Sequence, residues 1–383
     1  MIHGIHWQAY PLGMGTASVY ILLYNLKKHP AWLTKLEIVL FILNCLIFIS
    51  ATSLLGVQAF LYTKQFKRVI MDPNRNSFIP TFALNFATII VGLVNYVVPA
   101  GLTIEEVYVI FWVYVAMSSV VAFSVMTIWF LRPRDPLGSM TPAWAFPVFP
   151  LMFTGVVAIN VLRIVPLTDP RAVTVVVVGL LGFGGGAFMS IFYLSIFLLR
   201  LMHTGFMAGH QANGAFVAVG PPGFSALVFF HMGKACRTIL PANKLISELA
   251  GEVWFAGCVF VGIMLTGTAF LLFILAVIPY WSRLHKHLDE ILGCWATTFP
   301  NVGLILSLKF LGETFNSPTF FAVQFVMTML IIIAYVAVFC LTGVAIYKGV
   351  IFSSNDKAIF ADDYDLDNMK VKVADERSLD YHA

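Results

Sequence analysis

Ten long apolar runs alternate with short polar connections along the chain. A helix that spans a membrane needs about 20 mainly apolar residues, and the connections carry proline, glycine or charge, as in Asp72-Pro73-Asn74-Arg75. The pattern therefore predicts ten membrane-spanning helices, at residues 8–25, 36–63, 78–99, 104–131, 144–165, 172–201, 214–232, 246–281, 294–312 and 319–348.

The even-numbered runs are long, whereas the odd-numbered runs are shorter and are interrupted by proline or glycine. A proline inside a helix frees a backbone carbonyl, which is tolerated at membrane depth only where protein or a watery cavity satisfies it. Proline is frequent in membrane helices generally, so the prediction rests on the alternation over five hairpins. We expect five broken helices inside, five long ones outside, and a central path. The breaks include Pro147, Pro150, Pro221, Pro222 and Pro300.

The composition agrees with this pattern. Hydrophobic residues make up 60% of the chain, charged residues make up 11%, and the mean hydropathy is +0.88. A soluble globular protein carries about 25% charged residues, so this chain cannot cover a surface exposed to water. The predicted fold class is an all-α integral membrane protein, with residues 1–350 as one ten-helix transmembrane domain.

The charge divides unevenly between this domain and the end of the chain. The formal net charge is +4, and Asp356 to Ala383 holds eight acidic and four basic residues, which leaves +8 for the rest. Residues 351–383 are predicted to be an acidic, disordered cytoplasmic tail. A positive membrane domain suits an anionic ligand, although positive loops on the cytoplasmic side would give the same excess. The side that holds the termini has ten basic residues against eight, which favours cytoplasmic termini.

A hydroxyl residue lies near the break of each odd-numbered run. Such hydroxyls could line a polar path and donate hydrogen bonds to an anion. They could instead bond to a carbonyl of the preceding helical turn or to a neighbouring helix. The candidate pore hydroxyls are Thr16, Thr81, Thr154, Ser225 and Thr298.

Four basic residues lie in or beside apolar runs, where an ionisable group is costly and is a candidate for function. Arg163 follows an apolar stretch, and Arg237 lies just past the seventh run. A guanidinium matches the two oxygens of a carboxylate, so these two arginines are our first candidates for attracting an organic anion. Lys309 and Lys234 are second. All four could instead extend to lipid headgroups or pair with nearby glutamates.

The sequence contains no pattern typical of catalysis or of metal binding. It has no GxSxG, HExxH or P-loop motif, its five cysteines form no CxxC pair, and its histidines accompany no carboxylate ligand set. The glycines of 182–186 lie mid-membrane without a preceding strand, so close helix packing explains them better than a nucleotide loop. We expect no enzyme activity, no metal, no cofactor and no nucleic-acid partner.

Three stretches carry a family resemblance. They are Thr141–Pro150 (TPAWAFPVFP), Phe216–Ser225 (FVAVGPPGFS) and Thr298–Gly303 (TFPNVG). In this order and spacing they resemble the tellurite-resistance/dicarboxylate transporter family, and within it the fungal malic acid transporters. The relatives include slow anion channels and sulfite efflux pumps. The resemblance covers essentially the whole membrane region.

The resemblance implies five helical hairpins about a pseudo-fivefold axis, inner helices that line a central pore, and a homotrimer surrounded by lipid, which we expect in the plasma membrane. In the channel branch an aromatic side chain on the ninth helix plugs the pore. Phe299 stands at the matching position here and is the candidate gate.

The Val219–Phe224 stretch resembles the malic acid branch more than the sulfite branch. It implies transport of C4-dicarboxylates, chiefly malate. Moving a dianion against the membrane potential costs about 2.3 kcal/mol per charge per 100 mV, which coupled proton entry would offset, with Glu252 or His231 as candidate carriers. The alternative is an inorganic anion channel or a sulfite exporter of the same fold.

Overall fold

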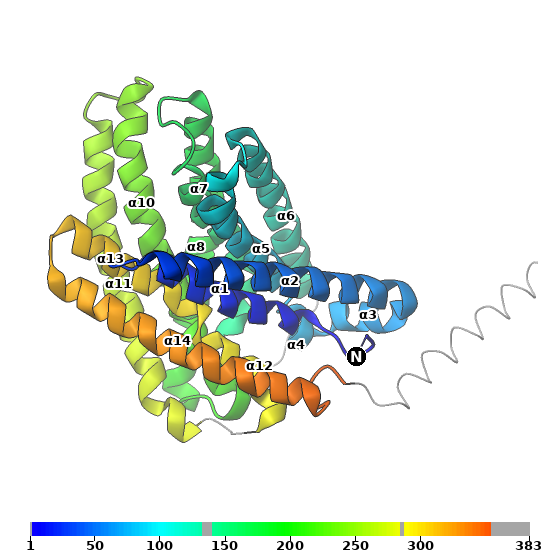
Figure 1. Cartoon of the computed structure of the whole chain (residues 1–383). Helices are drawn as coiled ribbons and strands as arrows, with labels where there is room; N and C mark the ends of the chain where they lie inside the picture. Colours follow the sequence, from blue (N-terminus) through cyan, green and yellow to red (C-terminus); the bar gives the residue numbers. More distant parts are fainter. Residues whose placement is uncertain (1, 132–139, 284–286, 354–383) are drawn as a thin grey trace, which may run out of the picture.

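The computed structural model describes residues 2–131, 140–283 and 287–353, and every regular element in these residues is a helix (Figure 1). Nine helical segments in this part of the chain are long and apolar enough to cross a membrane, as the all-α membrane fold requires. The remaining predicted span, 8–25, forms η1 (Trp7–Ala9) and α1 (Tyr10–Tyr24). Because α1 has 15 residues and several polar side chains, the structure does not confirm the count of ten spans.

The odd-numbered runs form the buried helices of the bundle. Among those long enough to span, between 67% and 89% of the most apolar window is buried. Besides α1, these helices with their short flanking segments are α5 (Pro80–Gly92) with η2 (Leu93–Val97) and η3 (Val98–Ala100); η5 (Pro142–Val148) with α7 (Phe149–Val161); η6 (Gly209–Asn213) and α9 (Gly214–Val217) with α10 (Gly220–Ala242); and η7 (Leu288–Glu290), α12 (Ile291–Cys294), η8 (Trp295–Thr297) and η9 (Phe299–Asn301) with α13 (Val302–Thr314).

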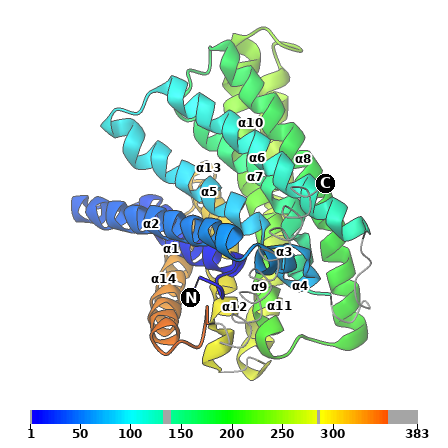
Figure 2. The same cartoon turned by 90° about the vertical axis from the view of Figure 1, so that its right-hand side faces the viewer.

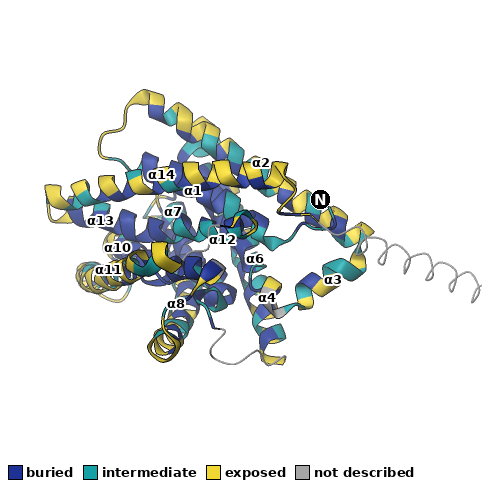
Figure 3. Cartoon of the chain, turned by 90° about the horizontal axis from the view of Figure 1, so that it is seen from below, coloured by how far each residue is buried: buried dark blue, intermediate teal, exposed yellow. Residues whose placement is uncertain are grey.

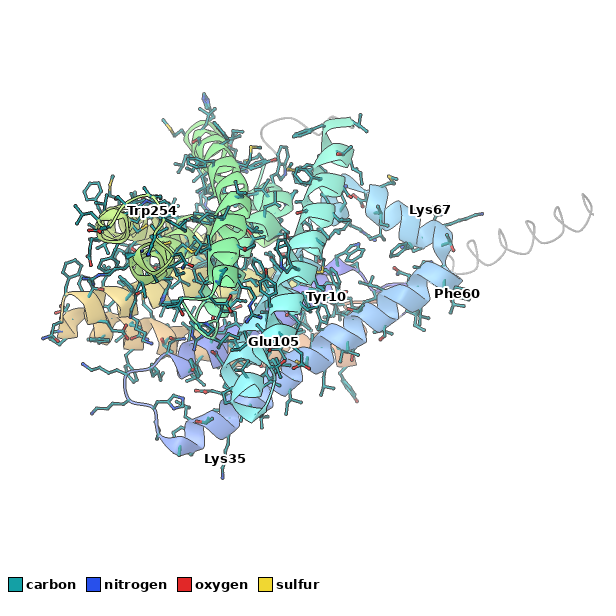
Figure 4. The ribbon with its side chains drawn as sticks, turned by 90° about the horizontal axis from the view of Figure 1, so that it is seen from above. Tyr10, Lys35, Phe60, Lys67, Glu105 and Trp254 are labelled. Atoms are coloured by element: carbon teal, nitrogen blue, oxygen red, sulfur yellow. The ribbon has the colours of Figure 1, made fainter. Side chains whose placement is uncertain are left out.

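The even-numbered runs form long outer helices, of which only 22% to 33% of the same window is buried (Figure 3). They are α2 (Ala31–Leu61), α6 (Ile104–Leu131), α8 (Pro170–Thr204), α11 (Ala250–Arg283) and α14 (Pro318–Tyr347). Two short helices, α3 (Thr63–Met71) and α4 (Pro73–Asn76), follow α2. The outer side chains face away from the bundle, as Phe60, which is 86% exposed, and Trp254 illustrate (Figure 4). This apolar surface suits lipid.

The five inner helices form a closed ring. Each contacts the next in the order α1, α5, α7, α10, α13, and α13 contacts α1 again. Each outer helix packs against its own inner partner and against the next inner helix of the ring, so α2 lies between α1 and α5, and α14 between α13 and α1 (Figure 2). The predicted five hairpins around a central axis are therefore present.

The prolines of the breaks lie where an inner helix begins. Pro150 lies in the first turn of α7, and Pro221 and Pro222 lie in the first turn of α10. Pro147 and Pro300 lie in the 3-10 segments η5 and η9, which precede α7 and α13. A proline in a first turn removes no helical hydrogen bond. The inner helices α7, α10 and α13 can therefore begin at or just after these prolines without losing a helical hydrogen bond.

Glycine allows α10 and α13 to touch backbone to backbone. A Cβ atom on Gly223 would lie 2.8 Å from the backbone nitrogen of Leu304, and one on Gly303 would meet the backbone of Phe224. Only glycine permits this approach. Two of the three family-like stretches are thus neighbours in space, and their contact fixes the position of Phe299.

The two ends of the described chain meet on one side of the bundle (Figure 1). Gln58 Nε2 donates hydrogen bonds to the carbonyls of three N-terminal residues at 2.9 to 3.1 Å. Ile351 and Phe352 are buried against the same region. The rest of the predicted tail, 354–383, and three basic residues counted on this side, Arg132, Arg134 and Lys286, lie outside the described residues.

Candidate functional site

Two cavities lie at opposite ends of the inner ring. The first, here called the terminal-side cavity, has a volume of about 450 Å³ and is lined by the N-terminal ends of the inner helices, including Thr81, Trp144 and Trp295. The second, the far cavity, has a volume of about 330 Å³ and is lined from the C-terminal ends of inner helices, including Asn25 and Asn160. Together they mark a path along the axis of the ring.

Phe299 is the one described residue that lines both cavities. Its side chain is only 5% exposed. Its ring centroid lies 5.7 Å from that of Phe153 on α7 and 5.2 Å from that of Phe224 on α10, and these two rings lie 4.6 Å apart. Three aromatic rings from three inner elements therefore separate the cavities, with Phe299 at the boundary.

The chain around Phe299 is held by its own polar side chains. Thr298 Oγ1 donates to the carbonyl of Trp295 at 2.7 Å, and Asn301 Nδ2 donates to the carbonyl of Thr297 at 2.8 Å. The first bond adds to the backbone bond that Thr298 N donates to the same carbonyl at 3.2 Å, and the second gives the carbonyl of Thr297 a side-chain donor at the break before α13. The backbone on either side of Phe299 is therefore fixed.

The far cavity holds two cations that are anchored by adjacent residues at the end of α1. Arg163 donates to the hydroxyl of Tyr24 at 3.1 Å, and Lys309 Nζ donates to Asn25 Oδ1 at 2.9 Å. Arg163 also donates to Asn95 Oδ1 at 2.8 Å and to Asn160 Oδ1 at 3.1 Å. Neutral oxygens thus position Arg163 without cancelling its charge.

Neither cavity has an aspartate or glutamate among its described lining residues. The nearest carboxylate to Lys309 is that of Glu313 at 3.6 Å, on a side chain that is 48% exposed. A pocket with low-dielectric walls that is lined by positively charged side chains concentrates anions. The electrostatics of the path therefore favour an anionic solute.

The terminal-side cavity is lined by Arg75 and His6. Burial, with a smaller contribution from the charge of Arg75, lowers the pKa of His6 from 6.5 to about 4. His6 Nδ1 accepts a hydrogen bond from the backbone nitrogen of Gln8 at 3.3 Å. At neutral pH, Arg75, whose Nε lies 3.5 Å from Oδ2 of Asp72, is therefore the charged residue in the described lining at this end of the path.

The depressed pKa of His6 makes the folded protein less stable in acid. Since the unfolded chain takes up this proton near pH 6.5 and the folded chain only near pH 4, the stabilisation is complete above 6.5 and is lost between 6.5 and 4. We expect His6→Asn, which keeps an acceptor for Gln8, to reduce this loss by up to about 3 kcal/mol. Thermal unfolding in detergent between pH 8 and 4 measures it, and parallel curves for wild type and variant would contradict it.

Four of the five candidate hydroxyls donate to a carbonyl of the preceding turn. The acceptors are the carbonyls of Leu12 for Thr16, Phe78 for Thr81, Leu151 for Thr154 and Trp295 for Thr298, at 2.6 to 2.9 Å. Among the five, Thr81 lines the terminal-side cavity, whereas Thr16, Thr154, Ser225 and Thr298 are buried and are not among the described lining residues of either cavity. The hydroxyl protons of Thr16, Thr154 and Thr298 are used in local bonding.

The four candidate cations separate into two pairs. Arg163 and Lys309 line the far cavity, as does His231. Arg237 and Lys234 lie on α10, which continues to Ala242, well past the predicted boundary at residue 232. Arg237 pairs with Glu252 at 2.6 Å on half-exposed side chains, and neither Arg237 nor Lys234 is among the described lining residues.

Several lining residues were not among the sequence-based candidates. They include the two aromatic partners of Phe299, the pair His6 and Arg75, and the asparagines that hold the cations. One signal was available: Asn25, Asn95 and Asn160 each stand near the end of an odd-numbered run. Such a recurrence at equivalent positions of successive hairpins indicates a shared location at one end of the ring.

A family model described as a voltage-dependent anion channel, SLAC1, matches residues 4–343. Several curated proteins are similar over most of their length. The sulfite efflux pumps SSU1 of Trichophyton rubrum and Arthroderma otae are 25% and 24% identical over 353 and 352 residues, which cover 91% of each chain. The malic acid transport protein of Schizosaccharomyces pombe is 24% identical over 323 residues, 82% of this chain and 72% of that protein.

Proposed function

Since the chain belongs to the SLAC1 voltage-dependent anion channel family, which consists of channels and transporters and not of enzymes, we propose that it carries C4-dicarboxylates, chiefly malate. The matched region holds the whole inner ring and all described lining residues of both cavities. The sequence-based resemblance to the same family is thereby confirmed, and the transport of anions across a membrane follows from it.

The observation that supports a gated path most strongly is the position of Phe299. Two cavities with cationic linings meet at this one side chain, which packs against Phe153 and Phe224. We propose that Phe299 is the gate and that its rotation joins the cavities. The rings of Phe153 and Phe224 are buried in the core and cannot readily move with it.

The two cations of the far cavity support a substrate with two carboxylates. The guanidinium of Arg163 can hold one carboxylate through paired hydrogen bonds, and the ammonium of Lys309 can attract the other. The similarity to a malic acid transport protein points to the same class of substrate. In the terminal-side cavity, the hydroxyl oxygen of Thr81 would contribute to the polar lining of the path. Arg237 would contribute a positive charge outside the far cavity.

Sulfite efflux is the second candidate, because the similarity to sulfite efflux pumps extends over 91% of both chains. Sulfite is smaller and presents its charge on one centre, so it would need a single cation. Arg163 could serve either anion. The two functions therefore differ in whether Lys309 contributes to binding.

The proposal includes the surroundings of the protein. We propose a plasma-membrane homotrimer with cytoplasmic termini, lipid around the exposed outer helices, and a transport domain of residues 1–350 followed by a cytoplasmic tail of residues 351–383. In this orientation the terminal-side cavity opens to the cytoplasm and the far cavity to the outside.

Uptake of labelled malate into liposomes that contain the purified protein tests the proposed function. We expect saturable malate uptake that excess sulfite and chloride inhibit weakly. Sulfite flux without malate flux, in protein that elutes as a folded species, would replace the dicarboxylate proposal with sulfite efflux. Chloride currents without either flux would assign an inorganic anion channel.

A further inference from the structure

A carboxylate is fully buried next to the far cavity. Glu37 lies in the second turn of α2, and its side chain is 0% exposed. Its Oε1 lies 2.7 Å from Nε2 of His29, and its Oε2 accepts a hydrogen bond from the hydroxyl of Tyr96 at 3.3 Å. An isolated buried carboxylate is costly, so this group is held by a partner that can itself carry a proton.

His29 connects this carboxylate to solvent. It lies in the connection between α1 and α2, and its side chain is 27% exposed, whereas that of Glu37 is not. Its ring also contacts the ring of Tyr24, at a centroid distance of 6.3 Å. A proton can therefore reach the pair through His29, from the side of the bundle on which the far cavity lies.

A π-helical segment, η2, links the pair to the anion site. Its consecutive residues Asn95 and Tyr96 point to different partners: Tyr96 donates to Glu37, and Asn95 accepts from Arg163. Tyr24 makes a second link, since it accepts from Arg163 and contacts both His29 and Tyr96 through its ring. Segments of this kind occur frequently at functional sites.

Apart from His29 and Tyr96, the titratable groups near Glu37 in the described structure make no hydrogen bond to its carboxylate. The adjacent α1 contributes Tyr20 and Tyr24, η2 contributes Tyr96, and α5 has no titratable side chain. In the connection, Lys27 lies over the ring of Phe321, at 4.2 Å from its centroid, and Lys28 is exposed. On α2, Lys35 is exposed and points away from the bundle (Figure 4).

We propose that Glu37 and His29 form one proton-binding site whose occupancy controls anion binding at Arg163 and Lys309. The step is the transfer of one proton from water on the far side to the pair, which changes it from carboxylate with neutral imidazole to carboxylate with imidazolium. Its net charge changes from −1 to 0. No bond other than that to the proton forms or breaks.

The neutral pair no longer opposes the positive potential of the far cavity, so the anion binds more tightly when the proton is bound. By linkage the anion must then favour proton binding to the same extent. Couplings of this kind commonly amount to about 5- to 150-fold in affinity. The inference rests on the proposed function for its substrate, and it would offset part of the cost of moving a dianion across the membrane.

Proton uptake on anion binding tests this site directly. Malate at the pH of the sample is added to weakly buffered protein in detergent, and a pH indicator reports the protons taken up, while calorimetry at pH 5.5 and 8 gives the affinity. In wild type we expect up to one proton per chain and tighter malate binding at pH 5.5, by about 5- to 150-fold. Glu37→Gln and His29→Gln should abolish the uptake and most of this difference.

Two further variants are controls. Glu313→Gln removes the carboxylate 3.6 Å from Lys309 and should leave the uptake intact. His231→Gln removes the one histidine among the described lining residues of the far cavity, and it tests whether that residue takes up the proton instead. Loss of the uptake in His231→Gln with retention in Glu37→Gln would overturn the assignment. Elution and melting temperature confirm that each variant is folded.

The outcomes distinguish this site from the proposed function. Malate binding to wild type without proton uptake overturns the proton site and leaves the function standing. Absence of malate binding overturns the dicarboxylate function, and sulfite added to the same samples then decides the proton site. No proton uptake with either anion overturns it.

Discussion

Replacing Phe299 with alanine is expected to raise the rate of anion flux through the protein by roughly 5- to 150-fold. Phe299 is held between the cavities by two ring contacts, with Phe153 and Phe224. Aromatic pairs of this kind contribute about 0.5 to 1.5 kcal/mol each beyond burial. If both contacts break when the path opens, their sum of about 1 to 3 kcal/mol sets the expected gain. Initial rates of labelled anion uptake into liposomes measure it.

Phe230→Ala is the matched control for this experiment. Phe230 lies on the inner helix α10, is fully buried and stacks on Phe310 at 4.4 Å, but it is not among the described lining residues of either cavity. Its loss should lower stability without opening the path. An equal rise in flux in both variants would indicate general loosening of the bundle, and an unchanged rate in Phe299→Ala would remove the gate.

Replacing Arg163 with alanine is expected to weaken anion binding by at least about tenfold. Hydrogen bonds to charged groups contribute about 1.5 to 3 kcal/mol, and Arg163 is positioned for the anion by Asn95, Asn160 and Tyr24. Arg163→Lys should recover only part of the affinity, because one ammonium cannot satisfy these three oxygens and a carboxylate together. The concentration of anion at half-maximal uptake is the quantity to measure.

Arg237→Ala separates a pathway effect from a general loss of positive charge. Arg237 carries the same charge as Arg163, but it pairs with Glu252 at 2.6 Å and lies outside the described lining of both cavities. We expect less than a threefold change in half-saturation for Arg237→Ala. If Arg237→Ala weakened uptake as much as Arg163→Ala, the far cavity would not be the binding site.

The hairpin architecture could be predicted because its determinants are local. The length and hydropathy of a run are properties of consecutive residues, and a proline such as Pro150 or Pro300 affects the helix in which it stands wherever that helix lies. Phe299 was selected as a candidate by another route, because the short stretch that contains it and Pro300 resembles a known family. The count of ten spans is not confirmed, because α1 has only 15 residues and its polar side chains are buried within the ring.

The roles of the polar residues could not be predicted in this way. Arg163 and Arg237 look alike in the sequence, since each follows an apolar run. Arg163 leaves the end of α7 and turns towards α1 and η2, whereas Arg237 faces Glu252 across the contact of α10 with α11. The direction in which a side chain points depends on the rotation of its helix and on the neighbours that the ring brings together, and neither is a local property.

Glu37 illustrates most clearly the difference between what the sequence determines locally and what the tertiary structure determines. In the sequence it is a single acidic residue at the start of an apolar run, where a charge ordinarily lies in solvent. The order of residue types along the chain is enough to indicate a membrane protein of five hairpins with broken inner helices and a positive membrane domain. Folding then places His29 and Tyr96 against Glu37, and Asn95 against Arg163. These contacts join residues up to 68 positions apart, so they exist only once the ring has closed.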